Sequence, residues 1–173
     1  MNDIIFNFFF SFSSINLIAD ISLFVSYILI YVFIVLAILI PVFIRRDFIY
    51  ALLTFCTGAF TWVAVYIIKN IFAIDRPFIA LNLTPLFIET GFSFPSSHVA
   101  VISALMILVW KINRKLGFVF IAFSVLVAFS RMIIGVHYPI DVLIGGCFGM
   151  LIGLGISWFY KITNKFAFLR KYI

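Results

Sequence analysis

The organisation of this chain follows from one stretch, Ser130-Arg131-Met132-Ile133-Ile134-Gly135-Val136-His137-Tyr138-Pro139-Ile140-Asp141. It contains an arginine, a histidine and an aspartate, although 66% of the 173 residues are hydrophobic and only 10% are charged. Ionisable side chains within the membrane segments of a protein are costly, and they often mark a functional site. The stretch therefore indicates more than a membrane anchor.

Pro139 indicates where a helix begins. Proline suits the first helical turn, where its missing N–H is not needed, and it disfavours helix in the residue before it. We expect a helix from Pro139, with His137 on the preceding turn and Asp141 in the first helical turn. The carboxylate would then reach back to the imidazole, fix its tautomer and leave the other ring nitrogen free as a base or nucleophile. The alternative is an interfacial histidine with a capping aspartate.

The composition is that of an integral membrane protein. The mean hydropathy is +1.30, and 24 phenylalanines stand beside 12 basic and 6 acidic residues. The net charge of +6 does not indicate nucleic-acid binding, because the cations are scattered at the ends of apolar runs. Cys56 and Cys147 lie in different apolar runs, so we expect core packing without a disulfide or a metal site. No cleaved signal peptide is expected.

The apolar runs predict an all-α, polytopic membrane helix bundle that forms a single membrane domain, residues 1–173. A helix needs about 20 apolar residues to span a bilayer. We expect five spans, at residues 21–44, 48–68, 95–110, 116–130 and 139–160. Residues 1–20 are interrupted by polar side chains and are interpreted as an N-terminal interfacial helix. Residues 70–94 form the longest loop, and residues 161–173 form a basic tail.

The basic residues predict how the five spans are oriented. Nine of the twelve fall on one side, and these are Arg45, Arg46, Lys111, Arg114, Lys115, Lys161, Lys165, Arg170 and Lys171. Cytoplasmic loops of membrane proteins are rich in lysine and arginine, so we expect the C-terminal tail to be cytoplasmic. The other side carries Lys69, Arg76 and Arg131 together with both histidines, His98 and His137. This grouping predicts a site that opens toward the periplasm or the extracellular surface.

One further motif on that side pairs a lysine with an arginine. Lys69 is followed seven residues later by Arg76 and then by Pro77. An ammonium and a planar guanidinium can together hold the oxygens of a phosphoryl group. The alternative is a lysine whose side chain merely extends to the membrane interface.

Another motif, Ser93-Phe94-Pro95-Ser96-Ser97-His98, lies at the expected start of the third span. With Pro95 in the first helical turn, the next three N–H groups would face outward at the positive end of the helix dipole, where anions bind. The Ser96 hydroxyl would add a donor, and His98 could give a proton to a leaving oxygen. Helix capping and polar packing are the alternative.

Together the three motifs resemble the type 2 phosphatidic acid phosphatase family, membrane lipid-phosphate phosphatases that share an active-site plan with vanadium haloperoxidases. The family pattern is a lysine, six residues and Arg-Pro; then Pro-Ser-Gly-His; then Ser-Arg, five residues, His, three residues and Asp. This sequence differs at one specified position, where Ser97 replaces the usual glycine. The backbone N–H remains, so we expect function to survive, with a shift in phosphate geometry or preference. The resemblance covers about residues 48–160.

The resemblance implies a role for each matching residue. His137 would be the nucleophile that forms a phosphohistidine, Asp141 would orient it, and His98 would act first as general acid and then as the base that activates water. The phosphoryl oxygens would be held by Lys69, Arg76, Ser96, Arg131 and the backbone N–H of Ser97. The family needs no cofactor and no metal. Phosphoryl transfer depends chiefly on positioning and charge neutralisation, so three cations can replace magnesium.

Within the family, the short length and the outward-facing site resemble the bacterial undecaprenyl-diphosphate phosphatases of the bacitracin-resistance type. The resemblance implies an isoprenoid lipid diphosphate as substrate, a role in cell-wall (peptidoglycan) biogenesis and a place in a bacterial plasma membrane. Phosphatidylglycerophosphate, phosphatidic acid and the 1-phosphate of lipid A are alternative substrates. A lipid phosphotransferase and a non-catalytic membrane transporter are alternatives of another kind.

Glycines recur along the fifth expected span, at Gly145, Gly146, Gly149, Gly153 and Gly155. Small residues let membrane helices approach each other closely. Such a contact can form within one molecule or between two copies, and we expect it within one. The oligomeric state stays open at this point.

Overall fold

The computed structural model describes residues 2–170, with side chains described up to residue 163. All secondary structure in this part of the chain is helical. The α-helices are α1 (Asn2–Ser11), α2 (Asn16–Phe24), α3 (Ile30–Arg45), α4 (Phe48–Phe72), α5 (Pro77–Ala80), α6 (Ser97–Ile112), α7 (Arg114–Ile133) and α8 (Pro139–Arg170). A 3₁₀ turn, η1 (Phe12–Ser14), follows α1, and a π-helical segment, η2 (Val25–Leu29), joins α2 to α3.

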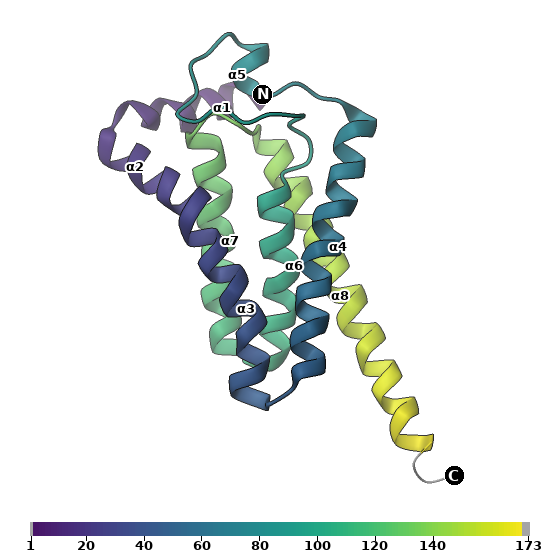
Figure 1. Ribbon diagram of the computed structural model, residues 1–173. Helices are drawn as coiled ribbons and strands as arrows, with labels where there is room; N and C mark the ends of the chain where they lie inside the picture. The colour runs from purple at the N-terminus through teal and green to yellow at the C-terminus, as the bar shows by residue number, and fades with distance from the viewer. Residues whose placement is uncertain (1, 171–173) are drawn as a thin grey trace.

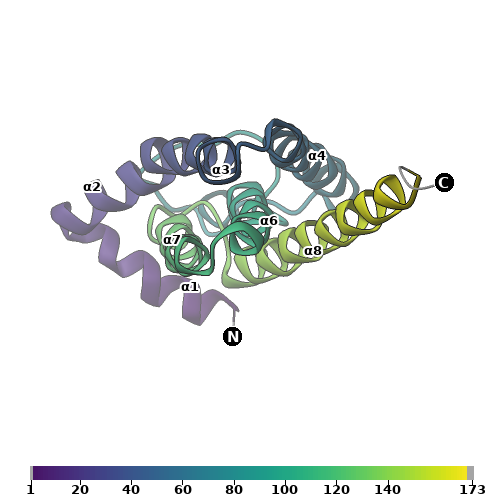
Figure 2. The same cartoon turned by 90° about the horizontal axis from the view of Figure 1, so that it is seen from below.

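Helix α6 is the central helix of the bundle. It contacts α3, α4, α7 and α8, which lie around it in Figures 1 and 2. Within the described part of the chain, four helical runs are long and apolar enough to cross a membrane, namely Asn16–Arg45, Phe48–Ala80, Arg114–Ile133 and Pro139–Thr163. Helix α6 is a shorter apolar helix of 16 residues. The predicted all-α membrane bundle of five helices is therefore confirmed.

Two helices begin earlier than the apolar runs suggested. The first helical run starts at Asn16 and passes through η2 into α3 without a break, whereas residue 21 was expected. Helix α7 starts at Arg114, because the side chain of Asn113 accepts hydrogen bonds from the N–H groups of Lys115 and Leu116 and so caps the helix. Polar residues therefore contribute to the first turn of α7, which apolar periodicity alone does not detect.

Two other boundaries also differ. Helix α6 begins at Ser97 and not at Pro95, because Ser96 has an extended backbone (φ −72°, ψ 113°) and serves as its N-cap. Helix α8 continues to Arg170, so most of the expected tail prolongs the fifth helix. Lys171, counted among the tail's basic residues, lies outside the described residues.

The N-terminal lead-in packs against the end of the bundle where α7 meets α8. Phe6 is fully buried, and the rings of Phe10 and Tyr138 both lie 5.5 Å from it between centroids. Gly135 has a φ of +87°, and a Cβ built there would lie 2.8 Å from the Phe10 ring. The lead-in is thus a packed part of the bundle, and its expected place at the membrane interface stays a prediction.

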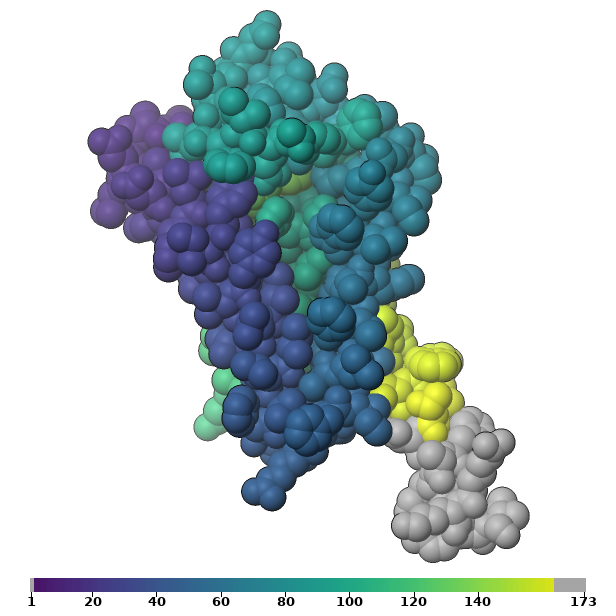
Figure 3. Space-filling model, in the orientation of Figure 1, coloured from purple at the N-terminus to yellow at the C-terminus, as the bar shows by residue number. Residues whose placement is uncertain are grey.

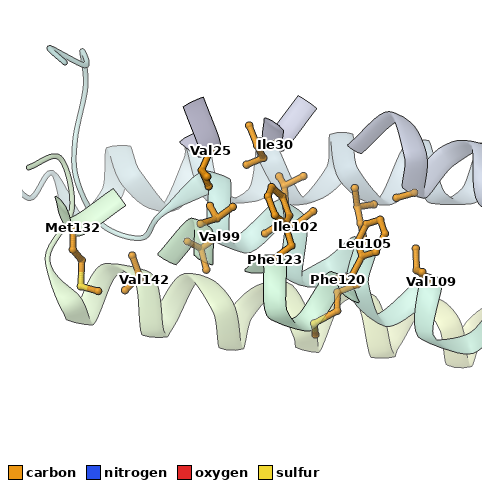
Figure 4. Packing of buried hydrophobic residues seen from close by; sticks show 14 residues of the cluster. Val25, Ile30, Val99, Ile102, Leu105, Val109, Phe120, Phe123, Met132 and Val142 are labelled. Carbon is orange, nitrogen blue, oxygen red and sulfur yellow. The ribbon is translucent and has the colours of Figure 1, made fainter. Parts of the chain in front are cut away.

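Buried apolar side chains of several helices form the core. Val99, Ile102 and Leu105 of α6 belong to one cluster with Phe120 and Phe123 of α7 (Figure 4). Burying such side chains between helices gives the bundle close packing, on which the association of membrane helices depends. The core therefore holds α6 in a fixed position inside the ring of longer helices.

The outer surface of the bundle carries many exposed apolar side chains, including Phe43, Ile49 and Leu143. Such a surface is expected where lipid takes the place of water. Cys56 and Cys147 are free and belong to this exposed surface. The expectation that the two cysteines pack in the core is therefore wrong.

Helices α6 and α8 approach each other closely at glycines of α8. A Cβ built at Gly145 would lie 2.7 Å from the Ser96 carbonyl oxygen, one at Gly149 would lie 2.0 Å from the Ala100 carbonyl oxygen, and Gly153 is similarly crowded. The expected close contact within one molecule is confirmed for these three glycines. This contact holds α8 against α6, and a hydrogen bond from the Ser96 N–H to the Asp141 carbonyl oxygen ties the first turn of α8 to the start of α6.

Candidate active site

The three sequence motifs meet at one end of the bundle, called the site end below. Helices α4 and α7 end there, α6 and α8 begin there, and the segment between α5 and α6 crosses the same end (Figure 1). A cavity of about 400 Å³ lies at this end, and its lining includes Lys69, Arg76, Glu89, Ser97, His98 and His137. Five of the eight side chains that the motifs nominated therefore share one cavity.

His137 and Asp141 lie together, as their spacing predicted. Nδ1 of His137 is 3.5 Å from Oδ2 of Asp141 and 3.4 Å from the hydroxyl oxygen of Ser93. The same carboxylate oxygen accepts hydrogen bonds from the Ser93 hydroxyl and, at 2.8 Å, from the Tyr138 N–H. Both ionisable side chains are 1% exposed. Since Nδ1 faces Asp141 and Ser93, Nε2 is the ring nitrogen available for chemistry.

The surroundings of His137 keep its imidazole neutral. Burial lowers the pKa of His137 well below its ordinary value of 6.5, and the charges of Arg131, Lys69 and Arg76 lower it further. A neutral imidazole has one nitrogen with a free lone pair. His137 is therefore in the protonation state that a nucleophile or a base requires.

Lys69 and Arg76 both bind the segment that precedes α6. The Nζ atom of Lys69 donates hydrogen bonds to the carbonyl oxygens of Phe92 (2.7 Å) and Ser93 (2.8 Å). The guanidinium of Arg76 donates to the carbonyl oxygens of Gly91 (2.9 Å), Val136 (3.1 Å) and Thr90 (3.2 Å). Both cations line the cavity, and both donate hydrogen bonds to backbone oxygens.

Arg131 is fully buried at the end of α7, and its main partner is Glu89. Nη2 of Arg131 forms an ion pair with Oε1 of Glu89, while Oε2 of Glu89 lies 2.9 Å from Nη1 of Arg76. The hydroxyl of Tyr27 donates to Oε1 of Glu89 at 2.6 Å. Nε and Nη1 of Arg131 are buried without a hydrogen-bond partner. One carboxylate thus bridges two of the three cations.

Glu89 remains ionised in this environment. Burial opposes its ionisation, but the charge and hydrogen bond of Arg131, the hydrogen bond of Tyr27 and the charge of Arg76 together lower the pKa of Glu89 to about 2. The negative charge at this position is therefore present over the whole physiological pH range.

Ser96 lies differently from the expectation. Because α6 begins two residues later than expected, the N–H of Ser96 donates to the Asp141 carbonyl oxygen at 3.0 Å and is not free to bind an anion. The prediction that this N–H faces outward is therefore wrong. The Ser96 hydroxyl is buried and has no hydrogen-bond partner. Ser97 and His98, in the first turn of α6, line the cavity as expected.

A second cavity of about 300 Å³ lies between α3, α4 and α6, and its walls are largely apolar side chains such as Ile34, Phe55 and Leu105. It shares Ser97, His98 and Trp62 with the polar cavity. Figure 3 shows α6 visible in a furrow between α3 and α4 on the outer face of the bundle. A polar site therefore adjoins an apolar groove at the side of the bundle.

Sequence reasoning missed three side chains of this site, namely Tyr27, Glu89 and Ser93. Ser93 belongs to the second motif, just before Phe94-Pro95, and this position was a usable signal. Ser93 was nevertheless assigned no role from the sequence. Glu89 is the only glutamate in the chain and lies in an apolar loop, so its isolation was a signal too. The position of Tyr27, in η2, gave none.

The arrangement fits chemistry on an anion. Lys69 and Arg76 line one cavity with a neutral imidazole that a carboxylate orients, and a second imidazole lies on the same cavity. Arg131 is buried beside it and pairs with Glu89. Among the residues that the structure describes, no group of three or more His, Cys, Asp or Glu side chains is placed to hold a metal ion. The cations present can neutralise the oxygens of a phosphoryl group.

Residues 47–165, well over half of the chain, match the protein family described as the PAP2 superfamily. The chain belongs to the PAP2 superfamily. The family assignment made from the three motifs is therefore confirmed. Among PAP2 relatives, undecaprenyl-diphosphatase BcrC of Bacillus subtilis (strain 168) is 32% identical over 124 residues, which are 71% of this chain and 63% of that protein. The matched region thus spans less than two thirds of that relative's length.

Two solved structures share the PAP2 fold of this chain. One is a transmembrane PAP2-type phosphatidylglycerolphosphate phosphatase from Bacillus subtilis, with a TM-score of 0.67, 22% identity and coverage of 84% of this chain and 76% of that one. The other is Aquifex aeolicus LpxE, with a TM-score of 0.68, 21% identity and coverage of 90% and 94%. At these identities the likeness establishes the fold.

Proposed function

We propose that this protein is a membrane lipid phosphatase that hydrolyses undecaprenyl diphosphate to undecaprenyl phosphate and inorganic phosphate. The observation that carries the proposal is that the polar cavity and the apolar cavity adjoin at Ser97 and His98. A lipid phosphate has an anionic head and a long apolar chain, and the two cavities match these two parts. The name of the Bacillus subtilis relative supports a diphosphate as the head.

In the proposed first step, the lone pair on Nε2 of His137 attacks the terminal phosphorus. A P–N bond forms, the bond from phosphorus to the bridging oxygen breaks, and undecaprenyl phosphate leaves. His98 lies on the same cavity and donates a proton to the leaving oxygen. Asp141 orients the attacking ring and stabilises the positive charge that develops on it.

In the second step, His98 takes a proton from water, and the water oxygen attacks the phosphorus. The P–N bond then breaks, its electron pair returns to His137, and inorganic phosphate forms. Lys69, Arg76 and Arg131 neutralise the phosphoryl oxygens in both steps. The protein needs no cofactor for this sequence of steps, because each proton and electron pair has a donor and an acceptor among the named groups.

We also propose that the site faces the periplasm or the exterior of a bacterial plasma membrane. The described helix ends opposite the site carry Arg45, Arg46, Lys111, Arg114, Lys115 and Lys161. Basic residues favour the cytoplasmic side, so that end and the tail would be cytoplasmic. Cysteine labelling from either side of sealed vesicles tests the orientation. Labelling of a Thr90→Cys variant only from the cytoplasmic side of the membrane would contradict it.

The test of the function is phosphate release by the purified protein in detergent, with EDTA present. Undecaprenyl diphosphate, phosphatidylglycerophosphate, phosphatidic acid and lipid A 1-phosphate are compared side by side, with His137→Ala as the control. Release that survives EDTA, is fastest on the diphosphate and vanishes in the variant supports the proposal. If a monoester is hydrolysed faster than the diphosphate, the proposed phosphatase chemistry stands, but the proposed substrate is wrong. Transfer of phosphate to a second lipid would indicate a phosphotransferase. The absence of any reaction would indicate a non-catalytic role such as transport.

A further inference from the structure

Glu89 bridges Arg76 and Arg131, the two arginines that the proposed function assigns to the phosphoryl group. Its two carboxylate oxygens are divided between Arg76 and Arg131, as two oxygens of a phosphoryl group would be. Glu89 lines the polar cavity, whereas Arg131 is fully buried and is not among the residues that line it. The carboxylate therefore separates the cavity from Arg131, a cation that the proposed chemistry requires.

A residue outside the three family motifs, Tyr27, supports the ion pair between Glu89 and Arg131. Tyr27, in η2, donates a hydrogen bond to the Glu89 oxygen that faces Arg131, and its ring lies 5.4 Å from the Arg131 guanidinium carbon. The two other guanidinium nitrogens of Arg131, Nε and Nη1, are buried and unpartnered. Buried polar atoms in proteins nearly always have partners. Arg131 is thus only partly satisfied by Glu89, and it can accommodate a ligand with more acceptor oxygens.

We propose that Glu89 is an internal anion that pairs with Arg76 and Arg131 in the place of a phosphoryl group, and that the phosphoryl group of the substrate must displace it. This inference rests on the proposed phosphatase function and adds a residue that positions Arg76 and Arg131. A buried guanidinium without a counterion is strongly destabilising, so the carboxylate stabilises the buried Arg131. Glu89 lies in the irregular segment between α5 and α6, so it can move away without unwinding a helix.

Displacement has a thermodynamic consequence that can be measured. If only molecules with Glu89 displaced can bind an anion, the apparent affinity equals the intrinsic affinity multiplied by the fraction of such molecules. The factor is the same for every anion that displaces the carboxylate, whatever its charge. Simple repulsion by a carboxylate that stays beside the ligand acts differently, because it penalises a dianion more than a monoanion. The same competition would return Glu89 to the arginines and release inorganic phosphate after each turnover.

The experiment measures the dissociation constants of orthophosphate and diethyl phosphate by calorimetry with the purified protein at about pH 8, where orthophosphate is chiefly a dianion. Glu89→Gln removes the competing charge and keeps the shape of the side chain. Tyr27→Phe removes only the hydrogen bond that holds Glu89. Asp75→Asn is the matched control, because it removes an exposed carboxylate beside Arg76 in the sequence.

We expect Glu89→Gln to tighten the binding of both anions by the same factor. The factor is about tenfold or more, because it corresponds to a site that Glu89 occupies in at least about nine-tenths of molecules. Tyr27→Phe tightens both by a smaller common factor, and Asp75→Asn changes neither. Unchanged or weaker binding in Glu89→Gln, or a larger gain for the dianion, overturns the displacement. If Glu89→Gln does not fold, unchanged affinities in Tyr27→Phe overturn it. If no form of the protein binds either anion, the proposed phosphatase function falls together with this inference.

Discussion

The two ends of the bundle use similar polar residues in different ways. At the end opposite the site, Asp47 caps α4 by accepting from the Tyr50 N–H at 2.8 Å and also accepts from the Tyr160 hydroxyl at 3.0 Å. Arg45 is exposed and donates to the Lys111 carbonyl oxygen at 2.7 Å. These groups are paired and partly hydrated, as the ends of helices normally are. They hold helix ends together. A cavity of about 640 Å³ lies at this end too, but the basic residues in its lining, Arg45, Lys111 and Lys161, are exposed and not buried.

At the site end the polar groups are buried and incompletely paired. Every buried side-chain nitrogen or oxygen without a hydrogen-bond partner, among the described side chains, lies there: Ser96 Oγ, Arg131 Nε, Arg131 Nη1 and Asp141 Oδ1. Unsatisfied buried polar atoms are costly, and natural proteins keep few of them. The comparison teaches that burial with missing partners, more than the presence of charges, separates a prospective site from an ordinary helix end.

The strongest way to test this comparison is to neutralise one aspartate at each end. Asp141→Asn can still accept from the Tyr138 N–H but loses the charge that stabilises a positive His137 ring. We expect kcat for phosphate release to fall by about 10⁴-fold, the loss seen when a neutral side chain replaces the carboxylate of a comparable dyad. Asp47→Asn retains a capping side chain, and we expect no change in kcat. Equal losses in both variants would show that the two ends do not differ in function.

A weaker effect is expected from His98, and it depends on the substrate. A monoester expels an alkoxide, which needs a proton, whereas a diphosphate expels a phosphate monoester, which needs little help. We expect His98→Gln to reduce kcat on monoesters by about 10²- to 10⁴-fold, the usual contribution of a general acid, and on diphosphates by less. Turnover of both substrate classes by the purified variant checks this. Equal losses on both classes would remove His98 from the role of acid and leave it only the role of base in the second step, which both substrates share.

The sequence alone was sufficient for the family and the helical bundle, and its three short motifs named five of the residues that line the polar cavity. His137 and Asp141 are four residues apart, so local helix geometry already brings them together. Glu89 and Tyr27 escaped detection because they contact Arg131 across 42 and 104 positions of sequence, and such contacts depend on how the helices pack. Ser96 was misplaced because its extended backbone delays the start of α6 by two residues.

Helix packing behind the site gives a prediction of smaller size. A methyl group at Gly149 would lie 2.0 Å from the Ala100 carbonyl oxygen, whereas one at Gly155 would meet nothing within 4 Å. We expect Gly149→Ala to destabilise the protein by at least about 1–3 kcal/mol through overpacking. Gly155→Ala should be neutral or stabilising by up to about 1 kcal/mol, since alanine favours helix. Thermal unfolding in detergent measures both, and similar midpoints for the two variants would refute the close contact of α6 with α8.

The least disruptive test changes only the pH. Burial and the neighbouring cations lower the pKa of His137 in the folded protein well below 6.5. A histidine with a lowered pKa contributes stability above its unfolded-state pKa, and this contribution is lost as the pH falls toward the folded-state value. The chain has two histidines, so the ring signals of ¹⁵N-labelled His98→Gln protein report His137 alone. We expect a neutral ring at pH 6.5 in the folded protein and a half-protonated one after unfolding. If the pKa of His137 in the folded protein is at or above its ordinary value, water or anions reach the site far more than the buried geometry implies.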